Sequence, residues 1–254
     1  MIPYANPLDR ARALYRIPTA PQPNRTLEIC HGREPLLSGF NWPGEAHCLR
    51  VTGSAAEPGG GQPNLGRCPD VASLTGFADR LPFAAKSFDL VILHRTLDDL
   101  AAASELHAAR FDAAAFLNQV VDVLAPGGLV AGCVDNRHGL KRALRKLSRR
   151  WLGGASRSEA ADPAAAFSLS TLRALLVGAQ LSDIRLFTLL PDCDAPMKLV
   201  DADAGISKLA FRRELEAQRH CLSPLAYLAR RVAVESGLAR HLESAIFFWG
   251  YRAC

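Results

Sequence analysis

The sequence contains no long hydrophobic run, and this absence excludes several classes of protein. No stretch approaches the roughly 18 consecutive apolar residues that a membrane-spanning helix requires, and the first residues, MIPYANPLDRAR, include no apolar segment of signal-peptide length. The seven cysteines are odd in number, scattered and never arranged as C-x-x-C, which argues against a disulfide framework or a zinc site. We therefore expect a cytoplasmic protein with reduced, mostly buried and inert thiols and no bound metal.

The sequence has little net charge, but one segment concentrates positive charge. The chain has 254 residues, of which 49% are hydrophobic and 22% charged, as in ordinary globular proteins, and its net charge is only +5. Residues 136–151, NRHGLKRALRKLSRRW, nevertheless hold seven Lys and Arg and no acid. We expect a single domain over 1–254, with a helical insert at about 192–242 before the last strand.

Apolar segments of strand and helix character alternate along the chain. Strands are expected at 26–30, 46–52, 87–94, 129–134 and 243–252, with a further short strand within 70–83 and a long strand that ends near 191. Helices are expected to begin at 112 and at 168, and to span 139–151 and about 207–233. The run SFDLVILH has the continuous apolar character of a strand buried on both faces. This order predicts an α/β fold with a mostly parallel sheet and helices on both faces.

Three segments carry a resemblance to a known family. LPFAAKSFDLVILHRTL, FLNQVVDVLAPGGLVAGCV and FSLSTLRALLVGAQLSDIRLFTLLP resemble, in the correct order, motifs of the class I S-adenosylmethionine-dependent methyltransferases of the small-molecule, type 11-like kind. The resemblance implies a Rossmann-like seven-stranded sheet, mostly parallel with an antiparallel last strand. DNRHGLK and LPDCDAP resemble patterns of methyltransferases encoded among bacterial surface-polysaccharide genes, which implies a glycan or lipid-linked substrate.

The segment TLEICHGREP departs from the family's acid-x-Gly-x-Gly-x-Gly cofactor turn. Aligning Glu28 with the acid puts Cys30, Gly32 and Glu34 on the three glycine positions, so two glycines are lost. The resemblance also implies an acid after the second strand and an Asp after the third, but LRVTGS offers no acid and Phe77 replaces the Asp. The S-adenosylmethionine-binding residues that we expect are Glu28, Gly32, Thr52, Ala78, Asp79 and His94. Because the ribose and adenine acids are missing, we expect weak binding of this cofactor.

Polar residues at the ends of the fourth and fifth strands are the candidates for catalysis. His94 would be the base that takes a proton from a hydroxyl acceptor, or simply the polar end of a core strand. Asn136 and His138, beside Asp135, follow the next strand, and their alternative role is to cap a helix. Asp98 and Asp99 could pair in the pocket, although a solvated helix start is favoured for them, while Asp192 and Asp194 are ambiguous.

The basic helix predicted at 139–151 carries the predictions about partners. Residues 137–151 could bind an anionic surface such as a membrane headgroup, a lipid-linked glycan or a partner protein, or could be a solvated face over a core stripe. Nucleic acid is disfavoured, because Trp151 is the one aromatic residue in this cluster. Three functions follow: an O- or N-methyltransferase acting on a small molecule or glycan, a non-catalytic protein of the same fold that has lost the cofactor and positions a partner, or a protein peripheral at the inner membrane face.

Overall fold

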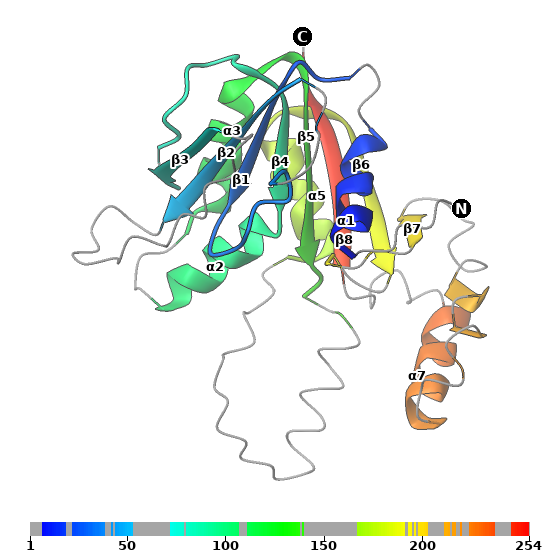
Figure 1. Ribbon diagram of the computed structural model, residues 1–254. Helices are drawn as coiled ribbons and strands as arrows, with labels where there is room; N and C mark the ends of the chain where they lie inside the picture. The colour runs from blue at the N-terminus through cyan, green and yellow to red at the C-terminus, as the bar shows by residue number, and fades with distance from the viewer. Residues whose placement is uncertain are drawn as a thin grey trace.

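The computed structural model contains one sheet of eight strands (Figure 1). The strands are β1 (Arg25–Cys30), β2 (Glu45–Thr52), β3 (Ala72–Phe77), β4 (Phe88–His94), β5 (Leu124–Asp135), β6 (Leu181–Leu190), β7 (Lys198–Asp201) and β8 (Ala245–Arg252). Their spatial order is β3-β2-β1-β4-β5-β8-β6-β7. The structure describes residues 7–18, 22–38, 42, 44–52, 72–78, 80–106, 111–137, 139, 167–190, 193–194, 196, 198–202, 211–213, 215–216, 219, 224–236 and 245–253.

The directions of the strands confirm the predicted sheet. β3, β2, β1, β4 and β5 are mutually parallel, and β8 runs antiparallel between β5 and β6. β7, which was not predicted, adds a short antiparallel strand beside β6 at the edge of the sheet. The strand order reverses between β1 and β4, and open α/β sheets bind ligands at the carboxyl ends of strands at such a switch point.

Helices cover both faces of the sheet. Three helices lie on one face, namely α2 (Thr96–Leu106), α3 (Ala113–Val123) and α5 (Leu169–Gly178), and α1 (Pro7–Arg16) lies on the other (Figure 1). β4 is central and buried on both sides, as predicted: Val91 and Leu93 join the core cluster with α2, α3 and α5, whereas Leu90 and Ile92 join the cluster with α1. Its continuous apolar sequence follows from this position.

Local signals in the sequence explain where α3 and α5 begin. The Asp112 side chain accepts hydrogen bonds from the amides of Ala114 and Ala115 at 2.9 and 3.1 Å, which caps α3. Ser168 caps α5 by accepting from the Thr171 amide at 3.2 Å. Both helices therefore start where polar caps precede apolar residues, as the sequence predicts.

The structure differs from the predicted helices at two places, and a third predicted helix lies almost wholly outside the described residues. α1 was not predicted, although its buried Ala11, Leu14 and Tyr15 have helical spacing. The helix predicted over about 207–233 is wrong in extent: the described residues are helical at 211–213 and 215–216, and α7 (Pro224–Glu235) begins at a proline. Proline suits the first turn of a helix, which agrees with the start of α7 at Pro224. The predicted basic helix at 139–151 lies outside the described residues except for residue 139.

The connection between β1 and β2 is unusual for parallel strands, which are generally joined by a helix. In its described part, residues 31–38, 42 and 44, no residue is helical. The Trp42 indole instead donates a 2.8 Å hydrogen bond to the Thr26 hydroxyl and anchors the connection to β1. The carboxyl end of β1 thus leads into a turn.

Helix length and hydropathy give one further result. Within the described ranges, none of the helices is both long and apolar enough to span a bilayer.

The contact between β5 and β8 yields a first prediction. A Cβ atom at Gly132 would lie 2.5 Å from Cζ of Phe248 and 2.8 Å from the Leu93 carbonyl oxygen, so Gly132→Ala forces these groups apart. We expect a loss of about 1–3 kcal/mol in the free energy of unfolding, measured with urea. In the control Gly178→Ala, in α5, the added Cβ has no heavy atom within 4 Å, and we expect no loss or a gain of up to about 1 kcal/mol. Equal losses in both variants would contradict this packing.

Candidate functional site

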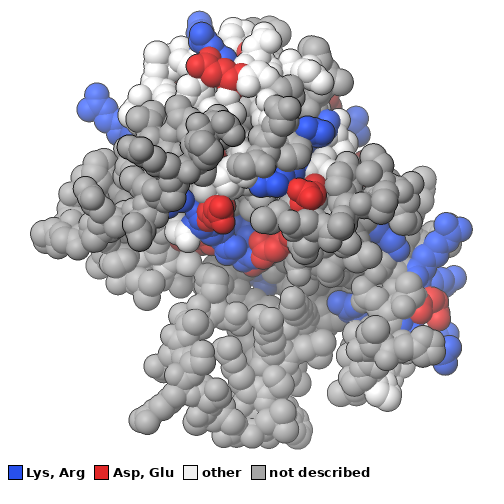
Figure 2. Space-filling view, viewed as in Figure 1, with Lys and Arg blue, Asp and Glu red and all other residues white. Residues whose placement is uncertain are grey.

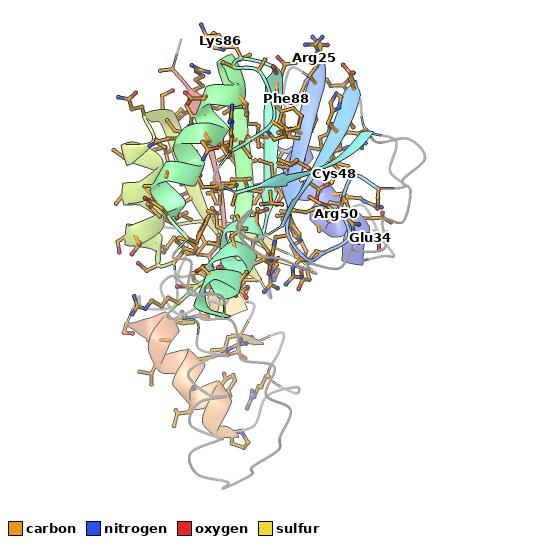
Figure 3. The ribbon with its side chains drawn as sticks, turned by 90° about the vertical axis from the view of Figure 1, so that its left-hand side faces the viewer. Arg25, Glu34, Cys48, Arg50, Lys86 and Phe88 are labelled. Carbon is orange, nitrogen blue, oxygen red and sulfur yellow. The ribbon has the colours of Figure 1, made fainter. Side chains whose placement is uncertain are left out.

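The carboxyl ends of the parallel strands gather polar side chains at one edge of the sheet. Figure 3 shows Glu34 and Arg50 near this edge and Arg25 and Lys86 at the opposite end. In Figure 2, acidic and basic side chains intermingle near the centre of the view. The residues at this edge come from the turn after β1, the start of α2, the ends of β4 and β5, and the turn after β6.

Glu28 holds the turn that follows β1. Its side chain is 1% exposed, and its two carboxylate oxygens accept hydrogen bonds from the amides of Leu36 and Leu37, each at 2.8 Å. Burial raises the pKa of Glu28, and the two amide hydrogen bonds oppose that shift. Glu28 therefore acts on the backbone of the turn.

Arg12 of α1 fixes the same turn from the other side. Its guanidinium donates to the carbonyl oxygens of Leu36 and Ser38, each at 2.5 Å. Gly32 has φ +63°, a backbone conformation that favours glycine, and a Cβ there would meet no atom within 4 Å. The turn is thus held by two charged side chains, and the space over Gly32 is open.

The two residues that replace family glycines differ in their surroundings. Cys30 is 3% exposed, and its sulfur lies 3.6 Å from that of Cys48, so it packs in the core. Glu34 is exposed and accepts a hydrogen bond from the Ser38 hydroxyl at 3.3 Å. The charge of Glu34 therefore stands at the surface of the turn.

Arg95 and Asp194 are central to a network of ion pairs. Arg95 reaches Asp135 at 2.6 Å and Asp194 at 2.8 Å, while Arg33 reaches Asp99 at 2.6 Å and Asp194 at 3.7 Å. Arg95 has φ +58°, which is uncommon for a side chain other than glycine, and its amide donates to the Cys133 carbonyl at 2.9 Å. Strained backbone of this kind concentrates at functional sites.

Asp98 is buried, which corrects the expectation of a solvated helix start for this residue. It is 2% exposed, and Oδ2 accepts from the Asp135 amide at 2.6 Å. Burial raises the pKa of Asp98. Its Oδ1 and the Nε of Arg95 are both buried, and neither has a hydrogen-bond partner among the residues that the structure describes. Buried polar atoms are normally paired, so this donor and this acceptor are suited to a polar ligand or to water.

His94 links this edge to a buried polar cluster beneath α1. Its Nε2 lies 3.7 Å from Asp194 Oδ1, and its Nδ1 lies 3.2 Å from the Cys133 sulfur and 3.0 Å from the Tyr15 hydroxyl. Cys193 and Tyr15 also hydrogen-bond to Cys133. Three polar groups therefore converge on the Cys133 sulfur.

The pKa values in this cluster favour a charged pair. Burial alone would lower the pKa of His94, but the charge of Cys133 and the hydrogen bond to Asp194 raise it to about 10. Burial alone would raise the pKa of the Cys133 thiol, but the hydrogen bond from Cys193 and the charge of His94 lower it well below its ordinary value. The hydrogen bond from His94, then Arg95 and Arg33, hold the pKa of Asp194 below its usual range. His94 is thus a cation at neutral pH.

The ends of β2 and β3 carry no acidic side chain among the described residues. Thr52 ends β2 in register with Phe77 at the end of β3. The nearby Val51 carbonyl accepts a 2.6 Å hydrogen bond from His31, and the Ala78 carbonyl accepts a 3.4 Å bond from Gln119. Near these strand ends, the carbonyl oxygens of Val51 and Ala78 already accept hydrogen bonds from the protein itself.

Other predicted site residues are either buried or outside the described ranges. Asn136 is 3% exposed, and its backbone bridges to Phe167. Asp79, His138 and Asp192 lie outside the described residues. Sequence reasoning missed Arg33, Arg95, Tyr15 and Cys133. Of these, Arg95 carries a usable signal, because it directly follows the predicted strand 87–94.

Comparison with known proteins identifies the fold. No protein-family profile matches the sequence, and no curated protein does. Among solved structures, a SAM-dependent methyltransferase from Thermotoga maritima matches with TM-score 0.53 and 13% identity, covering 98% of this chain and 88% of its own. Phosphoethanolamine N-methyltransferase 2 from Haemonchus contortus, in complex with S-adenosyl-L-methionine, matches with TM-score 0.51 and 14% identity, covering 97% of this chain and 53% of its own. The N-methyltransferase NodS from Bradyrhizobium japonicum matches with TM-score 0.50 and 13% identity over 98% of both chains. The fold is that of class I S-adenosylmethionine-dependent methyltransferases.

The charged pair predicts a distinctive dependence of stability on pH. Unperturbed His and Cys have pKa values of 6.5 and 9.0, so between these pH values the unfolded chain holds one proton on the two groups, as the folded pair does. The contribution of the pair should be constant there. It should fall above pH 9.0, where only the unfolded thiol loses its proton, and below pH 6.5, where only the unfolded imidazole gains one.

Urea unfolding of the wild type and Cys133→Ala between about pH 5 and pH 10 tests this shape. The difference between the two proteins should be largest on the plateau. Cys48→Ala is the control, because hydrogen bonding to Cys30 and burial raise the pKa of the Cys48 thiol and keep it neutral. A difference for Cys133→Ala that does not change with pH would show a neutral thiol.

Proposed function

We propose that the chain is an S-adenosylmethionine-dependent methyltransferase that acts on an oxygen or nitrogen of a small molecule or of a surface-glycan or lipid-linked substrate. The observation that supports this most directly is the unpaired Arg95 Nε and Asp98 Oδ1, both buried at the switch point of a methyltransferase sheet. A buried donor and a buried acceptor without partners among the described residues suit a zwitterionic ligand.

The donor set fits the amino-acid end of the cofactor. Arg95 would hold the carboxylate and Asp98 the ammonium group, and Gly32 leaves the adjoining turn open. When bound, S-adenosylmethionine supplies an electrophilic methyl group. The protein's task is then to hold the acceptor in line with that group.

The fit is poor at the ribose and adenine end. Thr52 and Phe77 stand where the family resemblance implies acids, and hydrogen bonds to charged groups contribute about 1.5–3 kcal/mol each. Losing both acids therefore weakens binding by roughly 10²- to 10⁴-fold. We expect a low affinity that still responds to changes at Arg95 and Asp98.

His94 is poorly suited to act as a base. Its pKa of about 10 keeps it protonated at neutral pH, and both ring nitrogens already face polar partners. Its role in this proposal is to place positive charge beside Asp194. Asp194 is about half exposed, so its carboxylate is accessible to solvent at this edge.

A non-catalytic protein of the same fold is the second candidate. It is favoured by the non-helical turn at 31–38, which offers no helix N-terminus to an anion, and by the ion pair between Arg33 and Asp99 across the edge. In that case residues 137–151 would bind a partner protein or an anionic membrane surface.

Calorimetry with S-adenosylmethionine tests the leading proposal. Arg95→Gln and Asp98→Asn should each weaken binding by about tenfold or more, because each alters a hydrogen-bonding group at the amino-acid end. Arg25→Gln, a matched loss of an exposed arginine at the opposite end of β1, should leave the affinity unchanged. Thermal unfolding confirms that the variants fold. Absence of binding by the wild type at any concentration would favour the non-catalytic candidate.

Restoring the family's residues gives the converse prediction. Glu34→Gly with Phe77→Asp should tighten binding of S-adenosylmethionine, since the first change removes an exposed negative charge from the turn and the second supplies an acid at the end of β3. The same calorimetry measures the change. A double variant that binds no better than the wild type would show that these positions do not face the cofactor.

A further inference from the structure

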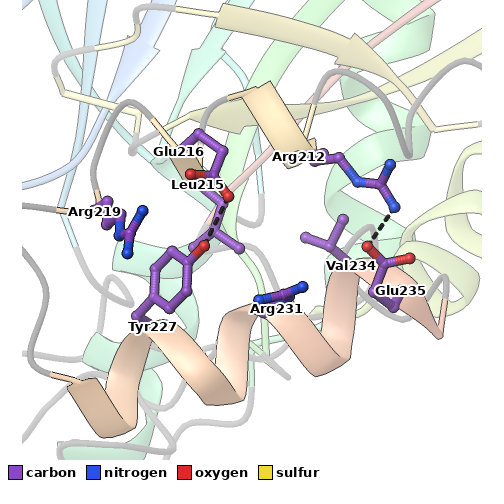
Figure 4. A pocket seen from close by; sticks show the side chains of 8 residues that line it. All are labelled: Arg212, Leu215, Glu216, Arg219, Tyr227, Arg231, Val234 and Glu235. Carbon is purple, nitrogen blue, oxygen red and sulfur yellow. Dashed lines mark hydrogen bonds and ion pairs between the residues drawn. The ribbon is translucent and has the colours of Figure 1, made fainter.

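A hollow of about 410 Å³ lies between α7 and the helical residues 211–213 and 215–216 (Figure 4). It is lined by Arg212, Leu215, Glu216, Arg219, Tyr227, Arg231, Val234 and Glu235. None of these residues belongs to the network at the carboxyl edge, so the hollow is a separate site. Its volume falls in the range of small-molecule sites, about 300–1,000 Å³.

The floor of the hollow is apolar and tied to the sheet. Leu215 and Val234 are each 4% exposed and pack in a small core cluster with Phe211. The same cluster includes Leu190 of β6 and Val200 of β7. The edge strand β7 therefore supports the hollow, which gives its floor a fixed position.

The two carboxylates of the rim are already engaged. Glu235 forms an ion pair with Arg212, and Glu216 accepts a 2.7 Å hydrogen bond from the Tyr227 hydroxyl (Figure 4). The first interaction neutralises Arg212. The second interaction pairs Glu216 with a tyrosine, so among the described residues Glu216 does not neutralise an arginine through an ion pair.

The two remaining arginines stand differently. The Arg219 guanidinium lies over the Tyr227 ring, 5.8 Å from its centroid, and Arg231 projects from α7 beside that tyrosine (Figure 4). Among the described residues, neither arginine has an ion-pair partner. With three arginines against two glutamates, the lining carries a net charge of +1, and the two arginines without an ion-pair partner among the described residues are Arg219 and Arg231.

We propose that this hollow binds a phosphate group, with Arg219 and Arg231 as its ligands and with Leu215, Val234 and Tyr227 contacting the moiety that carries the phosphate. The planar guanidinium fork matches phosphate oxygens in a bidentate manner, so two guanidinium groups without ion-pair partners can hold one phosphate. The phosphate comes from a soluble ester or from a lipid headgroup. The second source is compatible with Leu228 and Val232, which are 58% and 60% exposed on the same helix.

Calorimetry with glycerol phosphate, and sedimentation with vesicles of phosphatidylcholine with or without phosphatidic acid, distinguish the two sources. Binding to glycerol phosphate indicates a soluble ester, and binding confined to phosphatidic acid vesicles indicates a headgroup. In either case Arg219→Gln and Arg231→Gln should each weaken binding by about tenfold, and the double variant should abolish it. Arg213→Gln, an exposed arginine outside the lining, should change nothing.

Two outcomes would overturn the proposal, namely no binding to either probe and binding that survives in the double variant. Circular dichroism and thermal unfolding confirm that the exposed substitutions leave the fold intact. Because the hollow shares no residue with the strand-end site, these assays give their result whether or not the protein binds S-adenosylmethionine.

Discussion

The buried carboxylate of Glu28 is the constraint on which the strand-end site depends. A carboxylate at 1% exposure is costly unless its oxygens are paired, and here two backbone amides eight and nine residues later supply the pairing. This contact forces the chain after β1 to curl back over the sheet. Arg12 then fixes the carbonyls of the same turn, so α1 and the turn are positioned together. From this turn the side chain of Arg33 reaches Asp99 at 2.6 Å.

The ion-pair network is a second consequence of that geometry. Asp194 receives Arg33, Arg95 and His94, so the turns after β1, β4 and β6 meet at one carboxylate. Since Asp194 is about half exposed, solvent screens these pairs, and their value lies in orientation more than in stability. Three features of this arrangement are unfavourable: the strained backbone of Arg95, its unpaired Nε atom and the unpaired Oδ1 atom of Asp98. These features leave unpaired polar atoms at the switch point of the sheet, where open α/β sheets bind ligands.

Much of the sheet could be predicted because its signals are local. The continuous apolar run of β4, the caps Asp112 and Ser168, and the apolar segment of β8 each reflect nearby residues. The strand-end site could be predicted only in part. His94 was identified from its place after a strand, but Tyr15, which lies 79 positions away, has no signal that would link the two. The burial of Asp98 likewise depends on the Asp135 amide of a neighbouring strand, which no local pattern reveals.

The strand-end site is asymmetric in a way that bears on its function. Charged and unpaired groups concentrate at β1, β4 and β5, whereas β2 and β3 end in Thr52 and Phe77 without an acid. In the proposed function, a ligand held mainly at β1, β4 and β5 would gain its affinity from polar contacts with Arg95 and Asp98, and little from recognition of a ribose. Such a site discriminates by charge at one end of a molecule, because a neutral ligand would leave the buried Arg95 Nε and Asp98 Oδ1 unpaired. The chemistry that remains at this edge is therefore suited to an amino-acid-like zwitterion, whatever the rest of the ligand contains.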